Sequence, residues 1–230
     1  MPETPSTGWR IVCDPETLDE LRDDARFHVL LSLARVCNTL RFCQLVISEI
    51  PAADSPATAR QRLNAFLFMA AALYEGVKVA RMLRRHFRDE SAFVGGLGAL
   101  LKERDTKDLW RQALSKLRNK IVFHFDVDVP PAALERLDLP SYSFAAGLDR
   151  RAGHVYYDLA DAVAMNYLLD QLADGRPESE VTRDLLRRTV EVATRFVTAA
   201  DQLFSAVLPA MGFRLEGSID VPSESPSFGA

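Results

Sequence analysis

Residues 117–126, LRNKIVFHFD, place an arginine, a polar amide and a histidine in one short segment. The planar, permanently charged fork of arginine suits phosphate, and histidine exchanges protons near neutral pH. Together the two side chains can neutralise a charge-rich phosphate and move a proton without a metal ion. We therefore take Arg118, Asn119 and His124 as the candidate catalytic residues.

The context of this segment distinguishes it from similar spacings elsewhere. Arginine is also followed by histidine from Arg22 to His28 and from Arg81 to His86, so spacing alone says little in a chain this rich in arginine. Only in residues 118–124 does a polar amide follow the arginine, with an apolar Ile-Val-Phe run before the histidine. That segment also ends an amphipathic pattern.

The geometry of a regular helix leaves two interpretations of His124 open. Six residues turn through about 240° and rise about 9 Å, so Arg118 and His124 converge only if the helix is distorted or the long arginine reaches across. His124 follows Leu117 by seven residues, which places it on the apolar side of the helix. It is either a hydrogen-bonded core histidine or a titratable group in a cleft or two-fold interface.

The segment LRNKIVFHF resembles the Arg-x4-6-His motif of the HEPN superfamily, in which a polar residue typically follows the arginine. The resemblance implies an all-helical bundle that, in nuclease members, dimerises so that two motifs form one metal-independent RNA-cleaving site. It implies that Arg118 binds the scissile phosphate and that Asn119 orients the pair. His124 would act as general acid or base on the ribose 2′-hydroxyl or the leaving oxygen.

The same resemblance implies partners and an alternative role. Expected partners are a second copy of the chain, an RNA substrate, and an antitoxin or nucleotidyltransferase-type protein of a toxin or phage-defence system. Some toxin members carry a modified tyrosine two residues after the histidine, but Asp126 stands there in this chain, so that modification is not expected. A catalytically silent interaction or assembly module remains the alternative.

Basic side chains near the motif suggest where RNA would lie. Arg111, Lys116 and Lys120 supply positive charge next to the candidate arginine, enough for a short phosphate track, although a solvated helix face explains them equally well. Asp126 and Asp128 could raise the pKa of the histidine or repel RNA. The formal net charge is −4, so any contact with nucleic acid must be local.

Apolar residues at three- and four-residue steps predict an all-α fold, an antiparallel bundle of about five main helices with a small β-hairpin insertion near 141–157. We expect an N-terminal extension over 1–14, the bundle over 15–210, and a loose tail over 211–230. Gly95 to Gly98 predict a hinge or helix cap, since no Lys-Ser/Thr follows as in a phosphate loop. The predicted helices span 15–50, 56–88, 107–124, 159–173 and 180–208.

Composition limits the class of protein. With 48% apolar and 26% charged residues, the chain is an ordinary globular protein. Three cysteines without a CxxC pair fit a reducing compartment, and we expect no metal site and no cofactor. The apolar run 65–74 is too short for a bilayer, and no secretory signal is visible, so we expect a cytoplasmic protein without membrane contact.

Overall fold

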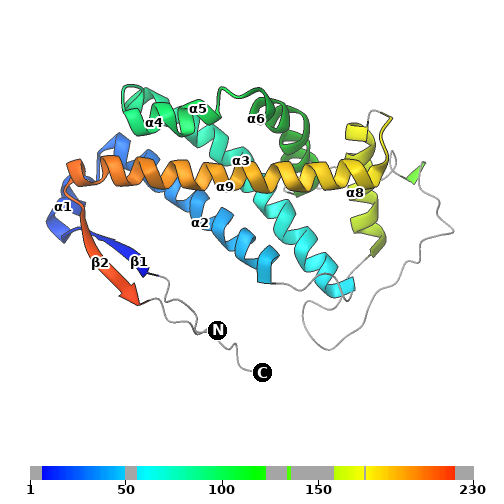
Figure 1. The fold of residues 1–230 in the computed structure, drawn as a ribbon, viewed down its shortest axis with the longest axis horizontal. Coiled ribbons are helices and arrows are strands. Elements are labelled where there is room, and N and C mark those ends of the chain that lie inside the picture. Colours follow the sequence, from blue (N-terminus) through cyan, green and yellow to red (C-terminus); the bar gives the residue numbers. More distant parts are fainter. Residues whose placement is uncertain (1–6, 50–55, 123–133, 136–157, 174, 221–230) are drawn as a thin grey trace.

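The computed structural model describes residues 7–49, 56–122, 134–135, 158–173 and 175–220, and most of them are helical. Figure 1 shows α9 (Glu178–Val207) running along the length of the molecule, with α2 (Ala25–Glu49) and α3 (Pro56–Phe87) crossing beneath it. The predicted helical character is therefore confirmed. The predicted hairpin near 141–157 lies outside the described residues.

The first predicted helix, residues 15–50, is in fact two helices. Helix α1 (Pro15–Glu20) ends early, and α2 starts at Ala25. Asp24 interrupts the run because its carboxylate accepts the Arg26 backbone N–H at 2.7 Å, as an N-cap residue does. Hydrogen bonds from Arg26 also lower the pKa of Asp24 to about 2, so the cap stays charged near neutral pH.

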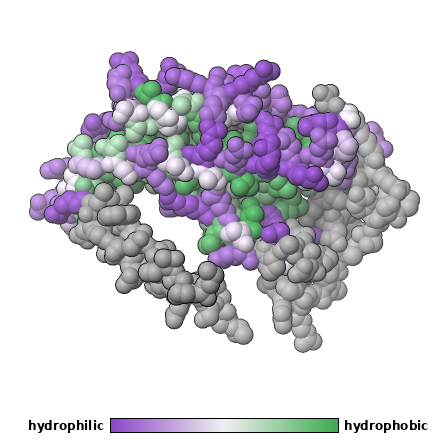
Figure 2. Space-filling model, in the orientation of Figure 1, coloured by the Kyte–Doolittle hydropathy of each residue, from purple (hydrophilic) through white to green (hydrophobic). Residues whose placement is uncertain are grey.

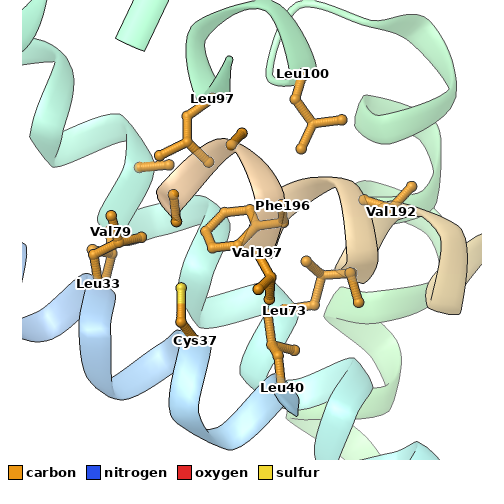
Figure 3. Close-up of a cluster of buried hydrophobic side chains, with 14 of the residues drawn as sticks. Leu33, Cys37, Leu40, Leu73, Val79, Leu97, Leu100, Val192, Phe196 and Val197 are labelled. Atoms are coloured by element: carbon orange, nitrogen blue, oxygen red, sulfur yellow. The ribbon is translucent and has the colours of Figure 1, made fainter. Parts of the chain in front are cut away.

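The core lies where α2, α3 and α9 meet. Its buried positions on α2 recur at three- and four-residue steps, as one face of a helix requires. Figure 3 shows Phe196 of α9 between side chains of the other helices, with Cys37 and Leu40 on one side and Leu97 on another. The buried residues of α2 are Phe27, Leu30, Leu33, Cys37, Leu40 and Cys43. Leu18 and Leu45 fit the same apolar spacing in the sequence, but both are exposed.

Gly76 lets the three central helices approach closely, and alanine there is expected to destabilise the protein. A Cβ at this position would lie 2.8 Å from Val36 Cγ1 and 3.0 Å from Phe196 Cζ. Alanine normally gains roughly 0.5–1 kcal/mol over glycine inside a helix, but overpacking costs roughly 1–3 kcal/mol. We therefore expect Gly76→Ala to lower the free energy of unfolding, measured in urea.

Gly95→Ala is the matched control, because a Cβ there meets nothing within 4 Å. This variant should be neutral or slightly stabilising in the same urea experiment. If Gly76→Ala were as stable as Gly95→Ala, the close approach of the helices at Gly76 would not limit packing.

Short helices complete one side of the bundle. Residues Gly95 to Gly98, predicted as a hinge or helix cap, are largely helical. Helix α4 (Ser91–Gly95) and helix α5 (Leu97–Leu100) meet at Gly96, which is the C-cap of the first and the N-cap of the second. Helix α6 (Arg104–Asp108) begins three residues before the predicted Lys107. Helix α8 (Asp158–Ala173) confirms the helix predicted over 159–173. It packs on α9.

Two strands replace part of the predicted extension and tail. Strand β1 (Thr7–Val12) pairs antiparallel with β2 (Arg214–Asp220), joining Val12 to Arg214 and Thr7 to Asp220, with an irregularity between Gly8 and Arg10. The expectation of a loose segment from residue 211 is therefore wrong for β2. Figure 1 shows this two-stranded sheet of β1 and β2 next to α1, below the left end of α9.

Two described helices pass a length and composition test for membrane spans. Residues 25–49 and 60–87 are long and apolar enough, but core helices of soluble proteins pass the same test. In Figure 2 hydrophilic side chains cover much of the visible face, and apolar groups gather below α9. The predicted absence of membrane contact and cytoplasmic location stay predictions.

Candidate functional site

The segment that carries Arg118 is helical but not a regular α-helix. Two π-helical stretches, η1 (Leu109–Leu114) and η2 (Leu117–Val122), follow α6 without a loop. Their backbone bonds span one residue more than those of an α-helix, which changes the direction of the side chains. Such stretches are rare and occur frequently at functional sites. The helix is therefore irregular from Leu109 onward, well before the histidine. Whether it is distorted at His124 lies outside the described residues.

Buried leucines fix the segment to the core. Leu109, Leu114 and Leu117 are almost completely buried, as is Ala113. The apolar spacing of this helix in the sequence, Trp110, Ala113, Leu114, Leu117 and Ile121, predicts a buried face, and burial confirms it at positions 113, 114 and 117. Because these buried residues face the core, the residues between them, such as Trp110 and Arg118, contact α3 or lie at the surface.

Arg118 is held at the contact between η2 and α3. Its Nε lies 2.9 Å from Glu75 Oε1, and both atoms are shielded from solvent, although 28% of the Arg118 side chain remains exposed. Its Nη1 donates to Asn119 Oδ1 at 3.0 Å. The structure thus brings Arg118 and Asn119 together and anchors the guanidinium to Glu75 of α3.

Two stacked aromatic rings lie beside this arginine. Trp110 of η1 stacks on Tyr74 of α3 with ring centres 5.2 Å apart and 8° between the planes, and its indole N–H donates to the Tyr74 carbonyl oxygen at 3.3 Å. Arg81 caps the tryptophan, with its guanidinium carbon 4.0 Å from the ring centre. Lys78 and Arg118 lie 5.7 and 6.0 Å from the tyrosine ring centre. Cations therefore flank both ends of the aromatic pair.

The remaining predicted site residues are not all gathered here. Lys116 points toward α8, where its Nζ donates to Gln171 Oε1 at 3.4 Å, so it does not share the α3 contact with Arg118. Arg111 is exposed on η1. His124 lies outside the described residues, as does the side chain of Lys120. Lys116 is thus directed away from Arg118, and the phosphate track of Arg111, Lys116 and Lys120 stays a prediction.

Sequence reasoning missed the residues that α3 contributes. Glu75 anchors the arginine, and Tyr74, Lys78 and Arg81 surround it, yet on the sequence Glu75 and Lys78 appear only as the polar end of an apolar run. Two signals were available: the spacing of Tyr74, Lys78, Arg81 and Arg85 places them on one side of a helix, and the basic run 81–88 holds both arginines, although that run also fits a helix end that complements the dipole. The spacing does not say which other helix this side of α3 contacts, because that depends on the tertiary packing.

A second candidate site is a cavity of about 690 Å³ between α2 and α9. Its lining is largely apolar, and its charged members, Arg41 and Asp201, pair with each other at 2.5 Å. Burial, aided by the charge of Asp201, raises the pKa of the Cys37 thiol to about 12. The thiol therefore stays protonated near pH 7 and is a poor nucleophile. This cavity offers less chemistry than the surroundings of Arg118.

Among the described side chains, no group of three or more His, Cys, Asp or Glu residues is placed to hold a metal ion. No protein-family model, curated protein or solved structure matches this chain. The arrangement around Arg118 and Asn119 is accordingly the strongest candidate site in the described part of the chain.

Proposed function

We propose that this protein is a metal-independent endoribonuclease of the HEPN type, acting as a homodimer in a toxin or phage-defence system. The observation that carries the proposal is Arg118, anchored by Glu75 and Asn119 on a π-helical segment, with 28% of its side chain exposed. An anchored cation suits catalysis because it stabilises developing charge without reorganising during the reaction.

The proposed reaction is transesterification within RNA. The ribose 2′-oxygen forms a bond to phosphorus, the bond from phosphorus to the 5′-oxygen breaks, and the products carry a 2′,3′-cyclic phosphate and a 5′-hydroxyl. One proton leaves the 2′-hydroxyl and one is delivered to the 5′-oxygen. His124 transfers a proton in these steps, Arg118 neutralises the phosphorane, and Asn119 keeps the arginine oriented.

RNA cleavage in EDTA tests this function. We expect the purified protein to cleave single-stranded RNA in EDTA and to leave 2′,3′-cyclic phosphate ends. His124→Ala should lower the cleavage rate by roughly 10²–10⁴-fold, the usual contribution of a general acid or base. An otherwise identical RNA with 2′-O-methyl groups is the control substrate, because it lacks the nucleophile.

Absence of cleavage, or cleavage that both His124→Ala and Arg118→Ala leave unaffected, contradicts the proposed ribonuclease. Cleavage of the methylated control would contradict the transesterification step alone.

The second candidate function is a non-catalytic interaction or assembly module. The observation that favours it is the same ion pair, because Arg118 and Glu75 join η2 to α3 and this link has structural value without any reaction. A module of this kind predicts that His124→Ala lowers stability or dimerisation. An unchanged melting temperature and an unchanged oligomeric state in that variant would count against the module.

A further inference from the structure

Three cations on α3 lead along the surface toward Arg118. We propose that Lys78, Arg81 and Arg85, here named the α3 stripe, bind the phosphate backbone of single-stranded RNA. This proposal rests on the proposed ribonuclease function and names the surface by which its substrate would approach. Arg81 and Arg85 belong to the basic run 81–88, which by itself also fits a helix end that complements the dipole. Helical spacing and the contact between α3 and η1 add Lys78 and order Arg81.

Helical geometry places the three side chains in one row. They follow Tyr74 at steps of four, three and four residues, which returns each side chain to nearly the same side of an α-helix. Arg81 and Arg85 are exposed, and 48% of the Lys78 side chain is exposed. The row extends about 10 Å along the helix axis. A stacked nucleic-acid strand places about three phosphates in that length.

The aromatic pair holds the middle cation in place. Arg81 lies 4.0 Å from the ring centre of Trp110, and Trp110 stacks on Tyr74. A guanidinium that lies over an aromatic face makes a cation–π contact and still has N–H groups that can reach phosphate oxygens. The structure has thus ordered this arginine before any ligand arrives, which lowers the entropy cost of binding.

In the described part of the chain, charge balance and position leave Arg81, the middle residue of the stripe, without an ion pair or a place in the last helical turn to explain it. Within the described residues neither Arg81 nor Arg85 forms an ion pair, and the acid beside them, Glu75, already contacts Lys78 and Arg118. The helix dipole accounts for cations in the last turn, which holds Arg84, Arg85 and His86. It does not account for Lys78 and Arg81, because both precede that turn.

Binding of an uncleavable RNA tests the stripe separately from catalysis. The probe is a fluorescent single-stranded 2′-O-methyl RNA oligonucleotide, followed by anisotropy between about 50 and 200 mM salt. We expect Arg81→Ala/Arg85→Ala to weaken binding about tenfold at the low-salt end. Losing two phosphate contacts should also reduce the slope of log affinity against log salt by about 1.4.

The matched control is Arg35→Ala/Arg183→Ala, which removes the same charge from exposed positions on α2 and α9. It should leave the salt slope unchanged, and equal melting temperatures of both double variants exclude unfolding. Equal affinity and slope in the two double variants overturn the α3 stripe. Displacement of the probe by polyglutamate as effective as by RNA of equal length also overturns it, since the surface would then bind acidic peptides.

The two proposals fail in distinguishable ways. Stripe-dependent binding of the methylated probe without cleavage of ordinary RNA in EDTA upholds the stripe and rejects the nuclease. Cleavage of ordinary RNA that the stripe variant performs with an unchanged KM upholds the nuclease and rejects the stripe. If both hold, the stripe variant should raise KM and keep kcat, because its contacts bind substrate and transition state alike.

Discussion

Replacing Arg118 with alanine is expected to lower the rate of RNA cleavage by roughly 10²–10³-fold, the usual loss when one preorganised charge-stabilising group is removed. The fold should survive the change. Glu75 keeps Lys78 as an ion-pair partner of its Oε2 at 2.8 Å, but its shielded Oε1 loses the arginine, so the free energy of unfolding should fall by about 1–2 kcal/mol. Single-turnover cleavage and urea unfolding of the same preparation measure the two effects.

Arg118→Lys separates charge from geometry. Lysine keeps the positive charge but lacks the planar fork that can contact Glu75 and a phosphate together, so it should restore little of the rate. Arg183→Ala on α9 controls for loss of one exposed positive charge and should cleave normally. A structural role of Arg118 would show instead as a loss of more than about 2 kcal/mol in stability for Arg118→Ala, with stability and activity recovering together in the lysine variant.

Phe196→Ala is expected to cost roughly 3–5 kcal/mol of stability, as truncation of a fully buried aromatic side chain does. The ring is completely buried and lies where α2, α3 and α9 meet. Rigid helices cannot close the resulting cavity fully, so both transfer free energy and packing contacts are lost. Against a typical total of roughly 5–15 kcal/mol, this loss decides whether the domain stays folded at 37 °C.

Phe68→Ala on α3 is the control, because it removes the same side chain from an exposed position on one of the helices that meet at Phe196. Its side chain is 54% exposed on α3, so its loss should change stability by about 0.5 kcal/mol or less. The measurement is the urea midpoint at constant m-value. A cost below about 1 kcal/mol for Phe196→Ala would mean that the three helices do not depend on this ring.

Local patterns were sufficient for the long helices. Apolar spacing predicts α3, α8 and α9 within a few residues, because each helix buries one continuous face and the spacing of that face is written in the chain. Pro15 and Pro56 mark helix starts for the same local reason. The break at Asp24 was missed because the carboxylate competes with the helix for backbone N–H groups, and periodicity does not register that competition.

Pairing between distant segments was beyond local patterns. The ribbon of β1 and β2 joins residues near the two ends of the described chain, and the polar composition of residues 211–230 predicts looseness when read alone. Strand pairing depends on which partner the fold brings near. The same limit applied to Lys116, because its hydrogen bond to Gln171 of α8 directs it away from Arg118.

The sequence by itself determined the helical class, the boundaries of α3, α8 and α9 and the choice of Arg118 and Asn119 as candidates, since these depend on residue type and short-range spacing. The role of His124 is still a prediction from sequence. Only the tertiary structure decided that Glu75 anchors Arg118 and that Trp110 and Tyr74 hold Arg81, because these contacts join helices whose facing sides are fixed by packing of the core. The chemistry of a site depends on such neighbours, and core packing, unlike spacing, selects them.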